Sequence, residues 1–141
     1  MGLNQSKKLS AAKPPDGTIF FIDRSLGVEP LRTALSKEGL TVEIHDDHFV
    51  RDEQDRVWLK TVGTRGWVVL TKDQKLRYRP LEISALRESK ARVFVLNAGN
   101  LRGQEIAEAF VLSMRRICSL LRTRPGPFLA YVSRSGRVTV N

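Results

Sequence analysis

Three aspartates occupy positions from which their carboxylates could act together on one ligand. Asp23 directly follows the apolar run 18–22, Asp73 comes just after the apolar run 66–71, and Asp55 opens a segment with helical periodicity. Ligands of parallel sheets bind beyond the carboxyl ends of the strands, so acids at these ends are expected to lie near one another. Close carboxylates repel unless a cation neutralises them, and Mg²⁺ or Mn²⁺ prefers such oxygen ligands. The pattern therefore predicts one acidic metal site.

A divalent cation at such a site favours phosphate chemistry. It lowers the pKa of a bound water and stabilises the negative charge that builds on a phosphate under attack. The chain has 24 lysines and arginines, 15 acids and a formal net charge of +9, which favours a polyanionic partner such as nucleic acid. Taken singly, each aspartate fits a turn or a helix N-cap. Taken together, acids within a basic chain favour a metal-dependent nuclease.

Several basic residues lie beside the proposed acids in the sequence. They are expected to contact RNA phosphates, and a solvated basic surface is the alternative. These residues are Arg24, Lys72, Lys75, Arg77 and Arg79. Glu82 lies in the first turn of a predicted helix, where an acid is favoured by the helix dipole, so we assign it to capping first and to the site second.

A second group of acids lies in residues 43–55, which contain six of the fifteen acids of the chain. His45 and His48 belong to this segment, but their spacing is not that of a zinc site and no cysteine pair completes one. A solvated acidic loop is the favoured interpretation. From this loop we keep Asp47 as a candidate for an outer-shell carboxylate or a fourth metal-binding carboxylate. The acids expected to face solvent are Asp52 and Glu53.

Alternating strand and helix patterns predict the architecture. Apolar, β-branched runs predict strands at 18–22, 40–44, 66–71 and 92–96, with a final strand or hairpin in 128–132 and 137–140. Apolar residues at helical spacing predict helices at 30–38, 55–64, 80–89 and 103–121. This alternation is typical of an α/β three-layer sandwich, in which helices flank a mostly parallel central sheet.

The length of 141 residues fits one domain, which we place at 18–141. Residues 1–17 are polar and include two adjacent prolines, so they are predicted to form a flexible lead-in. Trp58 and Trp67 lie in apolar periodic runs and are predicted to pack in the core rather than stack on bases. The single cysteine, Cys118, is predicted to be buried and inert, and fits a reducing cytoplasm.

No stretch of the sequence approaches the roughly 20 apolar residues of a membrane span, so no membrane association is expected.

Four motifs of the chain resemble PIN-like domains related to the VapC-type toxins of bacterial toxin–antitoxin systems. The motifs are FFIDRSLG (20–27), HDDHF (45–49), DRVWL (55–59) and GWVVLTKDQKLRYRP (66–80). The similarity covers about residues 18–132.

This resemblance implies a PIN fold, a ribonuclease that depends on Mg²⁺ or Mn²⁺, RNA as substrate and a cognate antitoxin protein as partner. It matches Asp23, Asp55 and Asp73 to the catalytic, metal-binding acids of the family, and Thr71 to the threonine of the TxD motif, which would position Asp73 or a water. A homodimer of this chain is a further expectation.

Two alternatives of another class stay open. Related sequences often carry further acids directly after the position of Asp55, where this chain has Arg56 and Val57. A PIN-like module that binds RNA or protein without cleaving it is therefore the main alternative. A receiver domain phosphorylated on aspartate is the other, although receivers usually have adjacent acids after the first strand, where this chain has Arg24 and Ser25.

Overall fold

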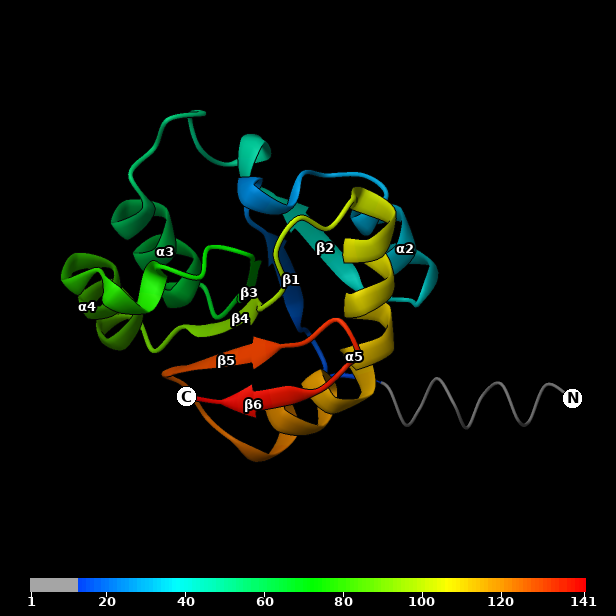
Figure 1. Cartoon of the computed structure of the whole chain (residues 1–141). Coiled ribbons are helices and arrows are strands. Elements are labelled where there is room, and N and C mark those ends of the chain that lie inside the picture. The colour runs from blue at the N-terminus through cyan, green and yellow to red at the C-terminus, as the bar shows by residue number, and fades with distance from the viewer. Residues whose placement is uncertain (1–12) are drawn as a thin grey trace, which may run out of the picture.

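The protein is built on one six-stranded sheet (Figure 1). The computed structural model describes residues 13–141. The strands are β1 (Ile19–Ile22), β2 (Thr41–Ile44), β3 (Val68–Thr71), β4 (Arg92–Leu96), β5 (Phe128–Val132) and β6 (Val138–Val140). Their order is β2-β1-β3-β4-β5-β6; the first five run parallel, and β6 pairs antiparallel with β5. The prediction of a mostly parallel sheet is confirmed.

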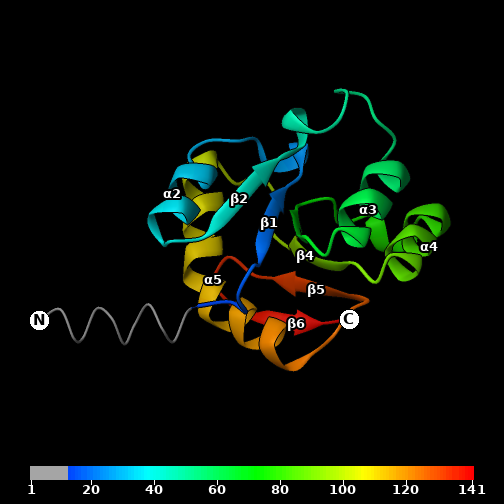
Figure 2. The same ribbon diagram turned by 180° about the vertical axis from the view of Figure 1, so that it is seen from behind.

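Helices cover both faces of this sheet. The α-helices are α2 (Leu31–Lys37), α3 (Asp55–Thr64), α4 (Pro80–Glu88) and α5 (Gly103–Thr123), and the short 3-10 helices are η1 (Arg24–Leu26), η2 (His45–Asp47) and η3 (Leu76–Tyr78). Helices α2 and α5 lie on one face, and α3 and α4 lie on the other, as the opposite views of Figures 1 and 2 show. The predicted three-layer sandwich is confirmed. None of the helices within residues 13–141 has the length and apolar character needed to cross a membrane.

The apolar runs form central strands because both of their faces are buried. In β1, Phe20 and Ile22 pack in the core under α2 and α5, whereas Phe21 packs in the core under α3 and α4. The same alternation holds in β3, where Val68 and Leu70 pack in the core under α2 and α5, and Val69 packs in the core under α3 and α4. Successive side chains of a strand point to opposite faces, so an unbroken apolar run is what a doubly covered strand requires.

The boundaries differ from the prediction mainly after α3. The run predicted as a strand from Gly66 begins only at Val68. Gly66 has a φ of 78° and Trp67 donates its backbone N–H to the carbonyl of Val62, so these two residues complete the end of the helix. At the C-terminus, the predicted strand or hairpin is a hairpin of β5 and β6.

The predicted lead-in, residues 1–17, falls mostly outside the described residues. Within the described part, the Thr18 hydroxyl donates to the carbonyl of Pro15 at 2.6 Å, which holds a turn in front of β1.

The strand order fixes where the site must lie. The chain leaves β1 for β2 on one side of the sheet, and β3 lies on the other side of β1. Ile22 is paired with Leu70, and the backbone N–H of Asp23 donates to the Leu70 carbonyl at 3.0 Å. Residues just beyond β1 and β3 are therefore neighbours, at the point where strand order reverses and where ligands of such sheets bind.

Candidate active site

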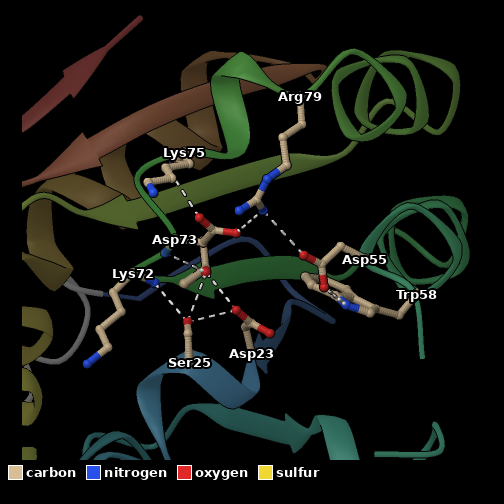
Figure 3. Close-up of polar contacts among 9 residues, drawn as sticks. Asp23, Ser25, Asp55, Trp58, Lys72, Asp73, Lys75 and Arg79 are labelled. Atoms are coloured by element: carbon tan, nitrogen blue, oxygen red, sulfur yellow. Dashed lines mark hydrogen bonds and ion pairs between the residues drawn. The ribbon is translucent and has the colours of Figure 1, made fainter. Parts of the chain in front are cut away.

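Asp23 is the buried acid of the site. It lies one residue beyond β1 and is 8% exposed. Its Oδ2 accepts a hydrogen bond from the hydroxyl of Ser25 at 2.7 Å (Figure 3). It accepts a second from the hydroxyl of Thr71, also at 2.7 Å. Burial raises the pKa of Asp23 above its ordinary value, the two hydroxyl hydrogen bonds oppose this rise, and the nearby Asp55 carboxylate adds to it. The carboxylate is thus held firmly, in an environment that disfavours its charge.

Thr71 joins the ends of the two central strands. It is the last residue of β3 and is fully buried. Its hydroxyl donates to Asp23 and accepts the backbone N–H of Asp73 at 3.1 Å. The Ser25 hydroxyl lies 3.1 Å from that of Thr71 and accepts the backbone N–H of Lys72 at 3.1 Å. These two hydroxyls therefore fix the position of Asp23 relative to the turn that carries Asp73.

Asp73 and Asp55 share one positive partner, Arg79. The Nη1 of Arg79 lies 2.5 Å from Oδ2 of Asp73 and 3.6 Å from Oδ2 of Asp55 (Figure 3). The second oxygen of Asp73 accepts the backbone N–H of Lys75 at 3.1 Å, and that of Asp55 accepts the indole N–H of Trp58 at 3.0 Å. The hydrogen bond to Asp73 raises the pKa of Arg79 above its ordinary value, so the guanidinium stays charged.

Asp55 comes from a different layer of the molecule. It is the first residue of α3, directly after the N-cap Gln54, which agrees with its predicted position at the start of that helix. An acid in the first turn is favoured by the helix dipole. Trp58, one turn further along, is buried as predicted, and its indole N–H, the only polar group of the side chain, orients Asp55.

The three aspartates line one open cleft of about 400 Å³. Its basic lining residues are Arg24, Arg51, Lys72 and Arg79, and its acidic ones are Asp23, Glu53, Asp55 and Asp73. The expected convergence of the three strand-end and helix-end acids is thus what the fold produces. Arg24 and Lys72, which were predicted to contact RNA, lie at this cleft.

Other predicted site residues lie elsewhere. Asp47 is exposed in η2 and does not line the cleft. Lys75 contributes its backbone N–H to Asp73, while its side chain is exposed outside the cleft lining. Arg77 packs over the rings of Tyr78 and Tyr131 and lines a separate cavity of about 260 Å³. The cleft lining also leaves out Glu82, which lies in the first turn of α4 as the capping interpretation expects.

Sequence reasoning missed four contributors to the cleft. Glu53 was expected to face solvent, but it is half-buried and lines the cleft. His45 was assigned to a solvated loop; it directly follows β2, is 3% exposed and packs against Phe21 and Trp58. Its place after an apolar strand is the signal that could have revealed this burial. The other two contributors are Ser25 and Arg51, whereas Arg79 was already predicted as a basic residue beside the acids.

In donor type, the cleft fits a hard divalent cation. Its acids and hydroxyls offer only oxygen, the ligand that Mg²⁺ and Mn²⁺ prefer. Asp55 raises the pKa of Asp23, which shows a repulsion that a cation would relieve. Within residues 13–141, however, no three acidic, histidine or cysteine side chains are close enough together to hold a metal ion. In this arrangement Arg79 supplies the positive charge to Asp55 and Asp73.

Comparison of the chain with known proteins identifies the family that carries this site. The family model described as "PIN like domain" matches residues 18–98, which include the three aspartates and Arg79. The chain belongs to the PIN-like domain family. It is also similar to a protein of Mycobacterium tuberculosis named "Putative ribonuclease VapC45", with 26% identity over 124 residues that cover 85% of this chain and 89% of that protein. No solved structure gives a significant match. The PIN-like domain predicted from the four sequence motifs is thus confirmed, together with its relation to VapC proteins.

Proposed function

We propose that this PIN-like domain is a metal-dependent ribonuclease that hydrolyses RNA phosphodiester bonds. The observation that carries the proposal is the meeting of Asp23, Asp55 and Asp73 in one cleft, at the carboxyl ends of β1 and β3. The name of the mycobacterial relative supports the same activity. Acidic and basic side chains that line the same cleft suit a metal ion and a phosphate-containing substrate.

Each side chain has a distinct task in this proposal. Asp23, Asp55 and Asp73 would hold Mg²⁺ or Mn²⁺, which when bound activates a water and neutralises charge on the phosphate. Thr71 and Ser25 keep the Asp23 carboxylate in place through their hydrogen bonds to Oδ2. Trp58 does the same for Asp55. The remaining basic side chains of the lining, Arg24, Arg51 and Lys72, would bind the RNA backbone.

The proposed biological role is that of the toxin in a toxin–antitoxin pair, acting on RNA in the cytoplasm. The support is the relation to VapC proteins. A cognate antitoxin would then bind this domain and restrain it. Co-expression with the small protein encoded by an adjacent gene tests this partner, because a stable complex that suppresses RNA cleavage is expected.

Cleavage of a defined RNA tests the activity itself. The wild-type protein with Mn²⁺ is expected to cleave the RNA, and a chelator is expected to stop the reaction. Asp73→Asn keeps the size of the side chain but loses the charge of a proposed metal ligand. Its cleavage is therefore expected to fall by about a hundredfold or more, since changing even an outer-shell partner of a metal site can cost about that much. Equal cleavage by the wild type and Asp73→Asn would contradict the proposal.

A non-catalytic RNA-binding module is the second candidate. It is favoured by the absence, in the described part of the chain, of any cluster of three side chains placed to hold a metal ion. The pairing of Arg79 with two of the three acids agrees with this candidate. This candidate predicts RNA binding that is unchanged by Mn²⁺, with no cleavage products at any metal concentration. The same RNA assay therefore separates the two functions.

A further inference from the structure

Arg79 carries the only basic side chain that pairs with the cleft aspartates within residues 13–141. Its Nη1 contacts both Asp73 and Asp55, although these acids lie on different elements, the turn after β3 and the start of α3. The guanidinium thus contacts two of the carboxylates that would also hold a divalent cation. In Figure 3 the side chain of Arg79 reaches down between them.

Arg79 is anchored by its backbone, and its side chain is accessible. It is the N-cap residue of α4, its carbonyl accepts the N–H of Ile83 at 3.0 Å, and Pro80 follows at the first helical position. The side chain is 40% exposed. The guanidinium can therefore swing out of the cleft by rotation about its own bonds, without disturbing the helix.

The charges of the cleft are only partly balanced by this contact. Asp23 receives hydrogen bonds from two neutral hydroxyls and pairs with no basic side chain in the described residues. The other basic residues of the lining, Arg24, Arg51 and Lys72, form no ion pair with the three aspartates in the described residues. At contact distance one guanidinium therefore faces three carboxylates, and this local excess of negative charge favours entry of a doubly charged ion. The same ion would repel Arg79 at contact distance, so the two cations cannot both be held tightly.

We propose that Arg79 is a built-in competitor of the divalent cation, an internal counter-ion that holds Asp55 and Asp73 together until a metal displaces it. The inference rests on the proposed function, because it assumes that these acids bind metal. It assigns to Arg79 a role in setting metal affinity. If Arg79 instead positioned the acids for the metal, removal of its side chain would weaken metal binding. If Arg79 competes with the metal, the same change strengthens metal binding.

Isothermal titration of Mn²⁺ into the full chain tests the proposal. Arg79→Gln removes the competing charge, so the affinity of this variant for Mn²⁺ is expected to be roughly tenfold higher than that of the wild type. A tenfold change lies between the interaction energies of a charge pair in bulk water and near a protein surface. The matched control is Arg134→Gln, which removes the same charge from an ion pair with Glu105 at 2.7 Å, outside the cleft lining. The control is expected to bind Mn²⁺ as the wild type does. An affinity of Arg79→Gln equal to or weaker than that of the wild type would overturn the proposal.

Two further variants separate the possible failures. Arg79→Lys keeps the charge but loses the planar fork, so it is expected to bind Mn²⁺ with an affinity between those of the wild type and Arg79→Gln. It serves as the test if Arg79→Gln does not fold, and binding no tighter than in the wild type would then count against the competitor role.

Asp23→Asn reports on the metal site itself. If the wild type binds Mn²⁺ and Asp23→Asn does not, but Arg79→Gln binds no tighter, only the role of Arg79 fails. If neither the wild type nor Arg79→Gln binds Mn²⁺, the metal site and the competitor both fail.

Discussion

Two acid-rich regions of the molecule differ in how their carboxylates are held. In the segment 43–47, Glu43 pairs with His48 at 2.6 Å, Asp46 pairs with Arg24 at 3.1 Å, and Asp47 is exposed. In the cleft, by contrast, Asp23 is buried and receives two hydroxyl hydrogen bonds from elements that the fold itself fixes. Three of the five residues of this segment are acids, yet none of these acids lines the cleft that holds the three aspartates.

This difference indicates that burial and fixed hydrogen bonds, rather than the number of acids in a segment, favour a ligand-binding site. Burial and neutral hydrogen bonds fix Asp23 even though they leave its charge uncompensated, which is costly unless something else binds there. The acids of the segment instead lie at the surface, where ion pairs contribute little. We therefore expect changes in the cleft to affect ligand binding and stability, and matched changes in the segment to have little effect.

The largest expected contrast concerns stabilisation by metal. At a hundredfold excess of Mn²⁺ over its Kd, a bound ion is expected to stabilise the wild type by about 2.7 kcal/mol. Asp23→Asn is expected to lose this stabilisation, and Asp47→Asn is expected to keep it, because Asp47 does not line the cleft. Thermal unfolding with and without Mn²⁺ measures both. A melting temperature of Asp23→Asn that rises with Mn²⁺ as much as that of the wild type would remove the distinction between the two regions.

A smaller effect is expected from the hydroxyl that joins the strand ends. Thr71→Val keeps the shape of the side chain but leaves Asp23 and the N–H of Asp73 each without one partner. We expect the free energy of unfolding to fall by about 1–3 kcal/mol, the cost of unsatisfied buried polar groups. The control is Thr61→Val on α3, whose hydroxyl donates to the carbonyl of Val57 within the same helix, with an expected change within about 0.5 kcal/mol. Urea unfolding measures both variants, and equal losses would show that Thr71 is not special.

The smallest effect is a pH dependence in metal-free protein. Because burial raises the pKa of Asp23 above its ordinary 3.8, the folded state favours the protonated form. The contribution of Asp23 to stability is then fully present below pH 3.8 and is lost as the pH rises through the raised pKa of the folded state. We therefore expect Asp23→Asn to gain stability relative to the wild type between pH 3.8 and neutral pH, in urea unfolding with chelator present. A constant difference across this range would contradict the assigned environment of Asp23.

The fold and the acids were largely predictable from the sequence, for a local reason. A short unbroken run of apolar, aromatic and β-branched residues, such as 18–22, favours a buried strand, and the residue that follows such a run in a parallel sheet lies at the carboxyl edge. Asp23 and Asp73 follow directly from this rule. Asp55 follows from its place at the start of a periodic segment, and β1 and β3 become neighbours through the strand order.

The partners of those acids could not be predicted in the same way. Arg77 and Arg79 are two residues apart in one short turn, yet only Arg79 reaches the cleft, while Arg77 packs over Tyr78 and Tyr131. Which side chain points inward depends on the backbone angles of η3 and the start of α4, and the sequence pattern does not specify these angles. Glu53 lines the cleft and Asp47 does not, the reverse of the prediction, because both lie in the short connection between β2 and α3, where no strand or helix periodicity indicates which side chain points inward.

The central claim is that the aspartates of the cleft, and not the acids of the segment 43–47, hold the catalytic cation. Crystals grown or soaked with Mn²⁺ and measured at the manganese absorption edge test it most directly, because anomalous scattering locates the ion itself. The account predicts one strong anomalous peak among Asp23, Asp55 and Asp73, with the Arg79 guanidinium moved away from Asp73. A peak beside Asp46 and Asp47, or none in the cleft at saturating Mn²⁺, would contradict it.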